Sequence, residues 1–181
     1  MSNDSVENIL PQESGSRPWF ARRGAWLLLV ASAVVLELTA LGFQYGMGLD
    51  PCVMCIYERV AVFGLLLAGT IGVLHPGSAA LRWAGYLTWA ISAGWGLQLA
   101  LRHVGIQIDK TASLGCSFAA EFPAWARLDE WFPAVFLPTG YCDDIQWQWM
   151  SLTMAQWMVV VFAVYLLILA VVLLTELRTP H

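Results

Sequence analysis

The chain has 181 residues, of which 59% are hydrophobic and 12% are charged, and its formal net charge is −4 at pH 7. Soluble domains carry about a quarter charged residues, so this composition excludes an ordinary soluble domain and indicates a membrane protein. The negative net charge also argues against binding to nucleic acid and against a polybasic lipid-surface protein.

Four mostly apolar stretches approach the roughly 20 residues that a transmembrane helix needs. They predict spans over residues 25–43, 56–74, 83–101 and 157–174. The second apolar run begins only at Val60, so it must recruit the preceding turn, which places Glu58 and Arg59 at the membrane edge. We therefore expect an all-α integral membrane four-helix bundle, with one four-span domain over 22–177 and polar tails at 1–21 and 178–181.

Four spans place both termini on one side of the membrane, and the distribution of Lys and Arg predicts that this side is the cytoplasm of a bacterial inner membrane. The positive charges counted on the two sides are Arg17, Arg22, Arg23, Arg82 and Arg178 against Arg59, Arg102, Lys110 and Arg127. The loops over 44–55 and 102–156 are then periplasmic. The second loop is rich in Trp and Phe, which predicts a short helix at the membrane interface.

All four cysteines fall in the two predicted periplasmic loops: Cys52 and Cys55 in the first, Cys116 and Cys142 in the second. An even number of cysteines on an oxidising side implies disulfide bonds. Two structural staples are one interpretation. A zinc site is another, although structural zinc sites favour two closely spaced ligand pairs and only one pair is close here. No motif for another metal site or for a flavin is visible.

The Cys-x-x-Cys spacing of Cys52 and Cys55 favours a redox role. It closes a small, reducible ring that stabilises little as a staple. Arg59 follows Cys55 by one helical turn on the same face, where its cation would stabilise a Cys55 thiolate. The alternative for Arg59 is an anchor whose guanidinium extends to the lipid headgroups.

Three segments of the sequence resemble the DsbB family: "RGAWLLLVASAVVLELTAL", "PCVMCIYER" and "QWQWMSLTMAQW". The likeness extends from about Arg22 to about Leu174. Members of this family are inner-membrane oxidoreductases that reoxidise the periplasmic thiol oxidase DsbA and pass the electrons to quinone. The resemblance therefore implies a protein dithiol:quinone oxidoreductase with ubiquinone or menaquinone as its cofactor and a DsbA-like partner.

The resemblance also implies roles for the cysteines. Cys52 and Cys55 would be the quinone-coupled pair, with Cys55 engaging the quinone ring. Cys116 and Cys142 would exchange with DsbA, with Cys116 as the sulfur attacked. Because a diffusing protein must reach this second pair, we expect it to be exposed and mobile.

Three further residues would lie near the quinone if the resemblance holds: Arg59, His103 and Gln107. A lone histidine at the end of a span is, on the alternative interpretation, an interfacial hydrogen-bonding residue. Two other functions remain open, a disulfide-stapled membrane scaffold or assembly protein and a related enzyme that serves a dedicated partner other than DsbA.

Glu37 is an ionisable residue well inside the first predicted span. It could handle protons for quinone chemistry, or it could be a protonated side chain that hydrogen-bonds between helices. Several glycines near the spans are expected to allow close helix packing: Gly42, Gly46, Gly48, Gly85, Gly94 and Gly96.

Overall fold

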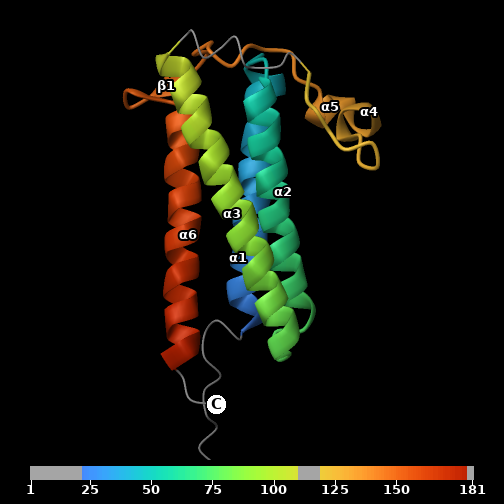
Figure 1. Cartoon of the computed structure of the whole chain (residues 1–181), viewed down its shortest axis with the longest axis vertical. Coiled ribbons are helices and arrows are strands. Elements are labelled where there is room, and N and C mark those ends of the chain that lie inside the picture. The colour runs from blue at the N-terminus through green and yellow to red at the C-terminus, as the bar shows by residue number, and fades with distance from the viewer. Residues whose placement is uncertain (1–21, 110–118, 179–181) are drawn as a thin grey trace, which may run out of the picture.

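The computed structural model describes residues 22–109 and 119–178, and four long helices in them run side by side along the longest axis of the molecule (Figure 1). These helices are α1 (Arg23–Leu41), α2 (Val53–Leu74), α3 (Ala79–Ile108) and α6 (Met154–Arg178). The mainly helical architecture expected from the sequence is confirmed. The predicted N-terminal tail, Lys110, Cys116 and residues 179–181 lie outside the described residues.

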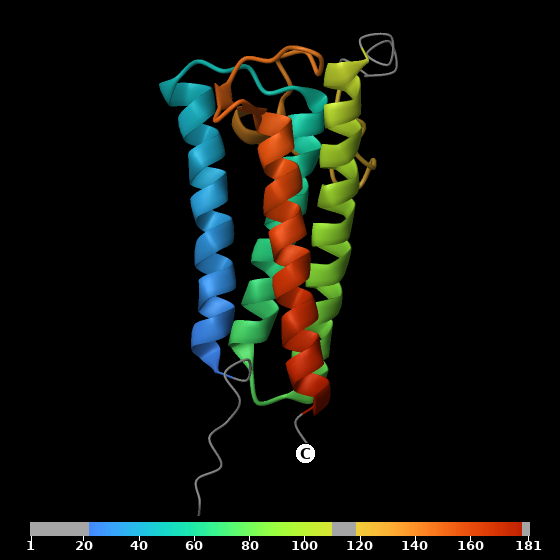
Figure 2. The same ribbon diagram turned by 90° about the vertical axis from the view of Figure 1, so that its left-hand side faces the viewer.

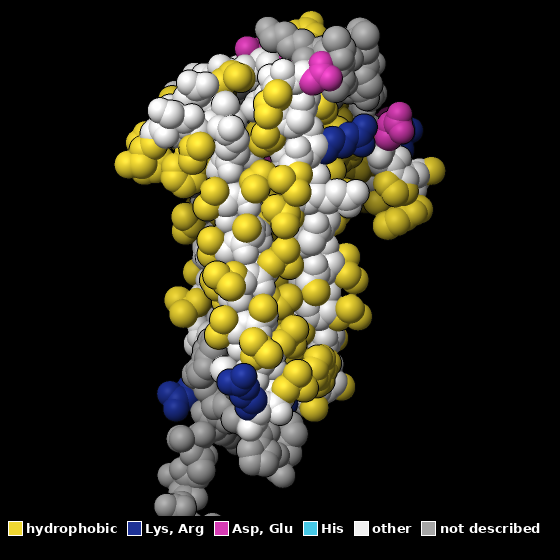
Figure 3. Space-filling model, turned by 60° about the vertical axis from the view of Figure 1, so that its left-hand side comes forward, with side chains coloured by type: hydrophobic (Ala, Val, Ile, Leu, Met, Phe, Trp, Pro, Cys, Tyr) yellow, Lys and Arg dark blue, Asp and Glu magenta, His cyan; other side chains and the backbone are white. Residues whose placement is uncertain are grey.

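Three helices in the described part of the chain are long and apolar enough to cross a membrane: Arg23–Gly46, Val53–Leu74 and Met154–Arg178. The first range combines α1 with the π-helical turn η2 (Gly42–Gly46) that continues it. Helix α3 has 30 residues but is less apolar, and it is not among the three. On the face drawn in Figure 3, hydrophobic side chains lie along the middle of the bundle and charged side chains lie toward its ends. An apolar surface of this extent suits a protein surrounded by lipid.

Small residues let the helices approach one another, and a few large side chains fill the remaining gaps. Ala33, Ala68 and Ala93 have no exposed surface, and neither has Phe162 of α6. A Cβ added at Gly96 would meet the Phe162 ring, and one added at Gly85 would lie 2.9 Å from the Trp26 ring. Close packing at these two glycines is therefore as expected. The same expectation is wrong for four others, because an added Cβ would meet nothing within 4 Å at Gly42, Gly46, Gly48 or Gly94.

A buried polar cluster joins α3 to α6 at the end of the bundle that holds the α2–α3 turn. Arg82 donates hydrogen bonds from Nε (3.2 Å) and Nη2 (2.8 Å) to Glu176 Oε1, and Tyr86 donates to Glu176 Oε2 (3.1 Å). Arg82 Nη1 also donates to Pro76 O. The first residue of α1 and the last residue of α6 lie at this same end of the bundle (Figures 1 and 2).

The opposite end is covered by the two connecting segments. The second contains α4 (Leu128–Trp131), α5 (Pro133–Phe136) and an antiparallel hairpin of β1 (Gln148–Trp149) and β2 (Leu152–Thr153). The hairpin departs from the all-α expectation. Its two turn residues, Met150 and Ser151, have φ values of 50° and 64°, as a tight two-residue hairpin turn requires.

The segment around α5 packs against η2, the π-helical turn with which the first connecting segment begins. Gln44 Nε2 and Tyr45 Oη both donate to the Ala134 carbonyl, at 3.3 and 2.5 Å. Phe136 is buried, and its ring centroid lies 5.5 Å from that of Phe63 on α2. These contacts fix the long loop against η2 and α2.

Candidate functional site

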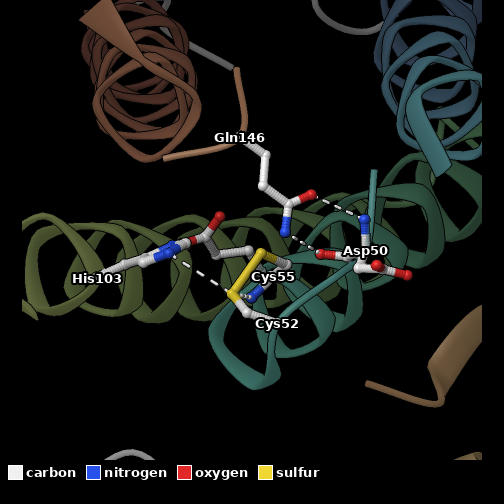
Figure 4. The surroundings of a disulfide bond; sticks show 6 residues. Asp50, Cys52, Cys55, His103 and Gln146 are labelled. Atoms are coloured by element: carbon white, nitrogen blue, oxygen red, sulfur yellow. Dashed lines mark hydrogen bonds and ion pairs between the residues drawn. A yellow bond between two sulfur atoms is a disulfide. The ribbon is translucent and has the colours of Figure 1, made fainter. Parts of the chain in front are cut away.

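A disulfide bond joins Cys52, which caps the N-terminus of α2, to Cys55 in the first turn of that helix (Figure 4). The Cys52 sulfur also accepts a hydrogen bond from the Cys55 backbone N–H at 3.2 Å. Pro51 is buried beside it, and Cys52 itself is only 2% exposed. The helix therefore begins at the disulfide and holds its two sulfurs in a fixed, largely buried position.

Cys142 of the second loop packs beside this disulfide. It belongs to the same cluster of buried side chains as Cys52, Leu99 and Ile106, and it takes part in a disulfide bond. Its exposed fraction is 3%, so the expectation of an exposed cysteine is wrong for Cys142, because the loop folds back over the start of α2. Cys116, the other predicted member of this pair, lies outside the described residues.

Hydrogen bonds between the two loops hold Cys142 in this position. The Asp50 N–H donates to Gln146 Oε1 at 2.8 Å, and Gln146 Nε2 donates to Asp50 O at 3.2 Å (Figure 4). The Thr139 and Gly140 N–H groups both donate to Pro51 O, at 2.9 and 3.0 Å. Gly140 approaches so closely that an added Cβ would collide with the Asp50 carbonyl oxygen. We call this set of contacts the loop clasp.

A cavity of about 290 Å³ opens beside the disulfide and is lined by both Cys52 and Cys55. Its wall is mostly apolar, and side chains of all four long helices contribute to it. Among them are Leu36 and Ala40 of α1 and Met158 and Val161 of α6. This volume lies near the lower end of the range for small-molecule pockets in proteins. The disulfide therefore faces an apolar chamber between the helices.

Arg59 of α2 lines the same cavity, and its guanidinium is bonded inside the bundle. Nη1 donates to Gln44 Oε1 at 3.1 Å and to the Val135 carbonyl. Its Nε lies 3.7 Å from Glu37 Oε2, which is an ion pair without a hydrogen bond. Because Arg59 is only 6% exposed, it does not extend outward as a headgroup anchor would. One interpretation of the sequence was that Glu37 forms a hydrogen bond between helices. In the structure, Glu37 of α1 instead forms this ion pair with Arg59 of α2.

His103 of α3 also lines the cavity and contacts the disulfide. Its Nε2 is 3.5 Å from Cys52 Sγ and its Nδ1 is 3.0 Å from Glu58 Oε1. Cys52, His103 and Glu58 are each at most 4% exposed as whole residues. Three potential metal-ligand atoms lie within 4.8 Å of one another here, from Cys52, Cys55 and His103. Both sulfurs are joined in the disulfide, however, so they are not thiolate ligands in this state.

Gln107, the remaining predicted site residue, also lines the cavity, one turn beyond His103 on α3. Its Oε1 accepts a hydrogen bond from Thr153 Oγ1 at 2.8 Å. Because α3 continues to Ile108, both His103 and Gln107 project from a helix that extends past the predicted span. The structure thus brings Cys52, Cys55, Arg59, His103 and Gln107 around one cavity.

Sequence reasoning placed Glu58 only at the membrane edge and did not identify Gln44 or Gln146 at all. A signal for Glu58 exists, because it follows Cys55 by three residues and therefore shares a helical face with it. No such signal exists for Gln146, which is separated from Asp50 by 96 residues. Only the folded loop brings them together.

Comparison with known proteins agrees with this geometry. A family model described as Disulfide bond formation protein DsbB matches residues 22–172. The Disulfide bond formation protein B of Shewanella sp. (strain MR-4) is 56% identical over 147 residues, which cover 81% of this chain and 84% of that protein. The protein of the same name from Aeromonas salmonicida (strain A449) is 52% identical over 157 residues, covering 87% and 91%. The resemblance found in the sequence is confirmed over most of the chain.

Proposed function

The chain belongs to the DsbB family, and from this premise we propose that it is a protein dithiol:quinone oxidoreductase that forms disulfides in a periplasmic DsbA-like thiol oxidase. One observation supports this proposal most strongly. The Cys52–Cys55 disulfide lines an apolar cavity between the helices, and Cys142 belongs to the same cluster of buried side chains as Cys52. A disulfide that lines an apolar chamber and shares a buried cluster with Cys142 is positioned to pass electrons toward that chamber.

The cavity residues fit a quinone. The wall is apolar enough for a lipid-soluble ring, and two buried polar atoms, Arg59 Nε and Glu37 Oε2, have no hydrogen-bond partner. Arg59 Nε–H would donate to a ring oxygen, while its Nη1 stays bonded to Gln44 and Val135. A bound quinone would supply the two-electron acceptor. Cys55 lines this cavity, which supports its role as the sulfur on the quinone side.

The second cysteine pair would receive electrons from the soluble partner. We assign Cys116 and Cys142 to this exchange, with Cys116 as the sulfur that the partner attacks. A thiolate of this pair would then attack the Cys52–Cys55 disulfide, so that the second pair becomes a disulfide again and the two electrons remain on Cys52 and Cys55. The loop clasp supports this step, because it holds Cys142 in the cluster that contains Cys52.

We further propose that all four long helices span a bacterial inner membrane, with both termini in the cytoplasm and the cysteine loops in the periplasm. Helix α3 runs within the bundle alongside the three more apolar helices (Figures 1 and 2). Exposed Trp125 and Trp131 in the second loop suit a membrane interface. The 22–177 region is then one membrane domain.

The test uses the purified full-length chain with a reduced thioredoxin-fold partner. We expect the partner to be oxidised only when ubiquinone or menaquinone is present, with an equivalent loss of quinone absorbance. A Cys55→Ser variant should consume no quinone. Failure of the parent protein to oxidise any dithiol partner with quinone present would favour a disulfide-stapled scaffold, and trapping of a partner unlike DsbA would indicate a dedicated pathway.

A further inference from the structure

The two sulfurs of the Cys52–Cys55 disulfide have different surroundings. Cys55 is partly exposed toward the cavity, whereas Cys52 is 2% exposed and contacts the buried His103. Reduction of the disulfide leaves a negative charge on each sulfur unless a proton arrives, and an uncompensated charge at a buried atom is costly. Cys52 therefore needs a proton source within the protein.

His103 is placed to be that source. Its Nδ1 lies 3.0 Å from Glu58 Oε1, and an ionised carboxylate can only accept, so with Glu58 ionised the proton of this hydrogen bond belongs to Nδ1. Nε2 is then the nitrogen that gains and loses a proton, and it lies 3.5 Å from Cys52 Sγ. Carboxylate, imidazole and sulfur thus form a line of three buried groups from two helices.

Other charged or titratable groups also line the cavity. They are Glu37 from α1, Arg59 from α2, and Asp50, Tyr141 and Asp144 from the loops. Glu37 and Arg59 face each other, and Asp50 accepts a hydrogen bond from Thr139. Among the described residues, α6 brings no titratable side chain to the cavity wall. Glu58 is the carboxylate that orients His103.

We propose that His103 carries the proton of Cys52 during the redox cycle and that Glu58 is its positioning residue. This inference rests on the proposed function, which supplies the electrons and the quinone that accepts them. When a thiolate of the second pair breaks the Cys52–Cys55 bond and the mixed disulfide is resolved, Cys52 is released with an electron pair. Protonated His103 gives its Nε2 proton to that sulfur, which leaves a Cys52 thiol and neutral imidazole.

The return half of the cycle reverses the proton transfer. His103 Nε2 takes the proton from Cys52 as its sulfur rebonds to Cys55, and two electrons leave through Cys55 to the quinone. One proton has then entered and left at Cys52 for each disulfide formed. This role differs from the one that the resemblance implied for His103, which was a direct contact with the quinone.

The first test isolates Cys52 in the full-length chain with Cys55, Cys116 and Cys142 replaced by Ser. The rate of Cys52 alkylation by iodoacetamide is measured against pH. Because a neighbouring imidazole favours the thiolate, we expect His103→Gln to slow alkylation at pH 6.5 by about tenfold or more. Glu58→Gln, which keeps His103, should change the profile in the same direction but less. His75→Gln, at the far end of α2, is the matched control and should change nothing.

The second test measures turnover in the four-cysteine protein with a reduced partner. We expect His103→Gln to lower kcat by about 100-fold, as for loss of a general acid and base, with the KM for quinone unchanged. An unchanged alkylation profile in His103→Gln overturns the proposal, whatever happens to turnover. A raised quinone KM with that unchanged profile would instead assign His103 to the quinone. Circular dichroism checks that each variant is folded.

The two tests also separate this inference from the proposed function. If the parent protein shows no quinone-dependent turnover, the proposed function fails and with it the redox role of His103. The alkylation arm would still report whether His103 and Cys52 share a proton. If turnover is normal in the parent and in His103→Gln alike, only the further inference fails.

Discussion

The side chain of Gln146 forms two hydrogen bonds with the backbone of Asp50, one as acceptor at 2.8 Å and one as donor at 3.2 Å. An amide group matches a backbone N–H and C=O together, which a carboxylate or a thioether cannot do. Asp50 lies two residues before Cys52, and Gln146 lies four residues after Cys142. This side chain therefore supplies two of the hydrogen bonds of the loop clasp that join the two cysteine loops.

Replacing Gln146 by Met should slow electron transfer between the two cysteine pairs. The substitution keeps the length of the side chain but removes both hydrogen bonds, each of which contributes about 0.5–1.5 kcal/mol. We expect the exchange to slow about tenfold, measured in a single turnover with reduced partner. Oxidation of Cys52 and Cys55 by quinone should be unchanged. Gln148→Met, on the exposed strand β1, is the control, and equal rates in both variants would contradict a role for the clasp.

The two cysteine pairs should fail in different ways, because they hold successive positions in one relay. A Cys116→Ser variant should lose exchange with the soluble partner, while quinone still oxidises Cys52 and Cys55. A Cys55→Ser variant should keep exchange between Cys116/Cys142 and the soluble partner but lose oxidation by quinone. Both states can be read by trapping free thiols at fixed times. Full turnover without either pair would make that pair a structural staple.

Arg59 should determine the apparent affinity for quinone. In Arg59→Lys the charge remains, but the single ammonium nitrogen cannot occupy both the position of Nη1, which bonds to Gln44 and Val135, and that of Nε, which faces the cavity. We expect a partial defect in Arg59→Lys and a rise of about tenfold or more in the quinone KM of Arg59→Met, since hydrogen bonds to charged groups contribute about 1.5–3 kcal/mol. The exchange between Cys116/Cys142 and the partner should be little affected.

Arg102→Met provides the matched control for this prediction, since Arg102 is an exposed arginine near the same end of the bundle. The measurement is turnover against quinone concentration at saturating partner. A quinone KM in Arg59→Met equal to that of Arg102→Met would return Arg59 to a purely structural role.

Two glycines on α3 should respond oppositely to the same substitution. In Gly96→Ala the new methyl group would collide with the Phe162 ring, and overpacking of this kind costs about 1–3 kcal/mol. In Gly94→Ala the methyl group meets nothing within 4 Å, so the gain in helix propensity of up to about 1 kcal/mol should remain. Thermal unfolding in detergent can be followed by the loss of helical content. We expect a higher midpoint temperature for Gly94→Ala than for Gly96→Ala. The reverse order would mean that α3 and α6 do not pack as described.

Much of the helical architecture could be predicted because its signals are local. The apolar stretches, the Cys-x-x-Cys spacing and the one-turn step from Cys55 to Arg59 are all properties of neighbouring residues. The burial of Cys142 could not be predicted in this way. It depends on Gly140 approaching Asp50 and on Gln146 bonding to it, and those contacts join residues about 90 positions apart.

His103 shows a different limit of sequence reasoning. Its position near the site was predicted, but its neighbours were not, because the partner of a side chain depends on helix rotation. Helix α3 turns His103 toward Cys52 and Glu58, while Gln107 reaches Thr153 at the base of the hairpin. The glycines show the same limit, since composition alone does not separate Gly96 from Gly94.

The buried pair of Arg82 and Glu176 has a consequence for biosynthesis. Glu176 follows Arg82 by 94 residues, so at about 5–20 residues per second it is synthesised roughly 5 to 20 seconds later. During that interval Arg82 is an unpaired cation beside the α2–α3 turn, and in the proposed topology it favours retention of that turn in the cytoplasm. Insertion of α6 then neutralises it. In the proposed topology, the charge of Arg82 would act before α6 is synthesised and would be paired only afterwards, so removing Glu176 should leave the orientation of α2 and α3 unaltered.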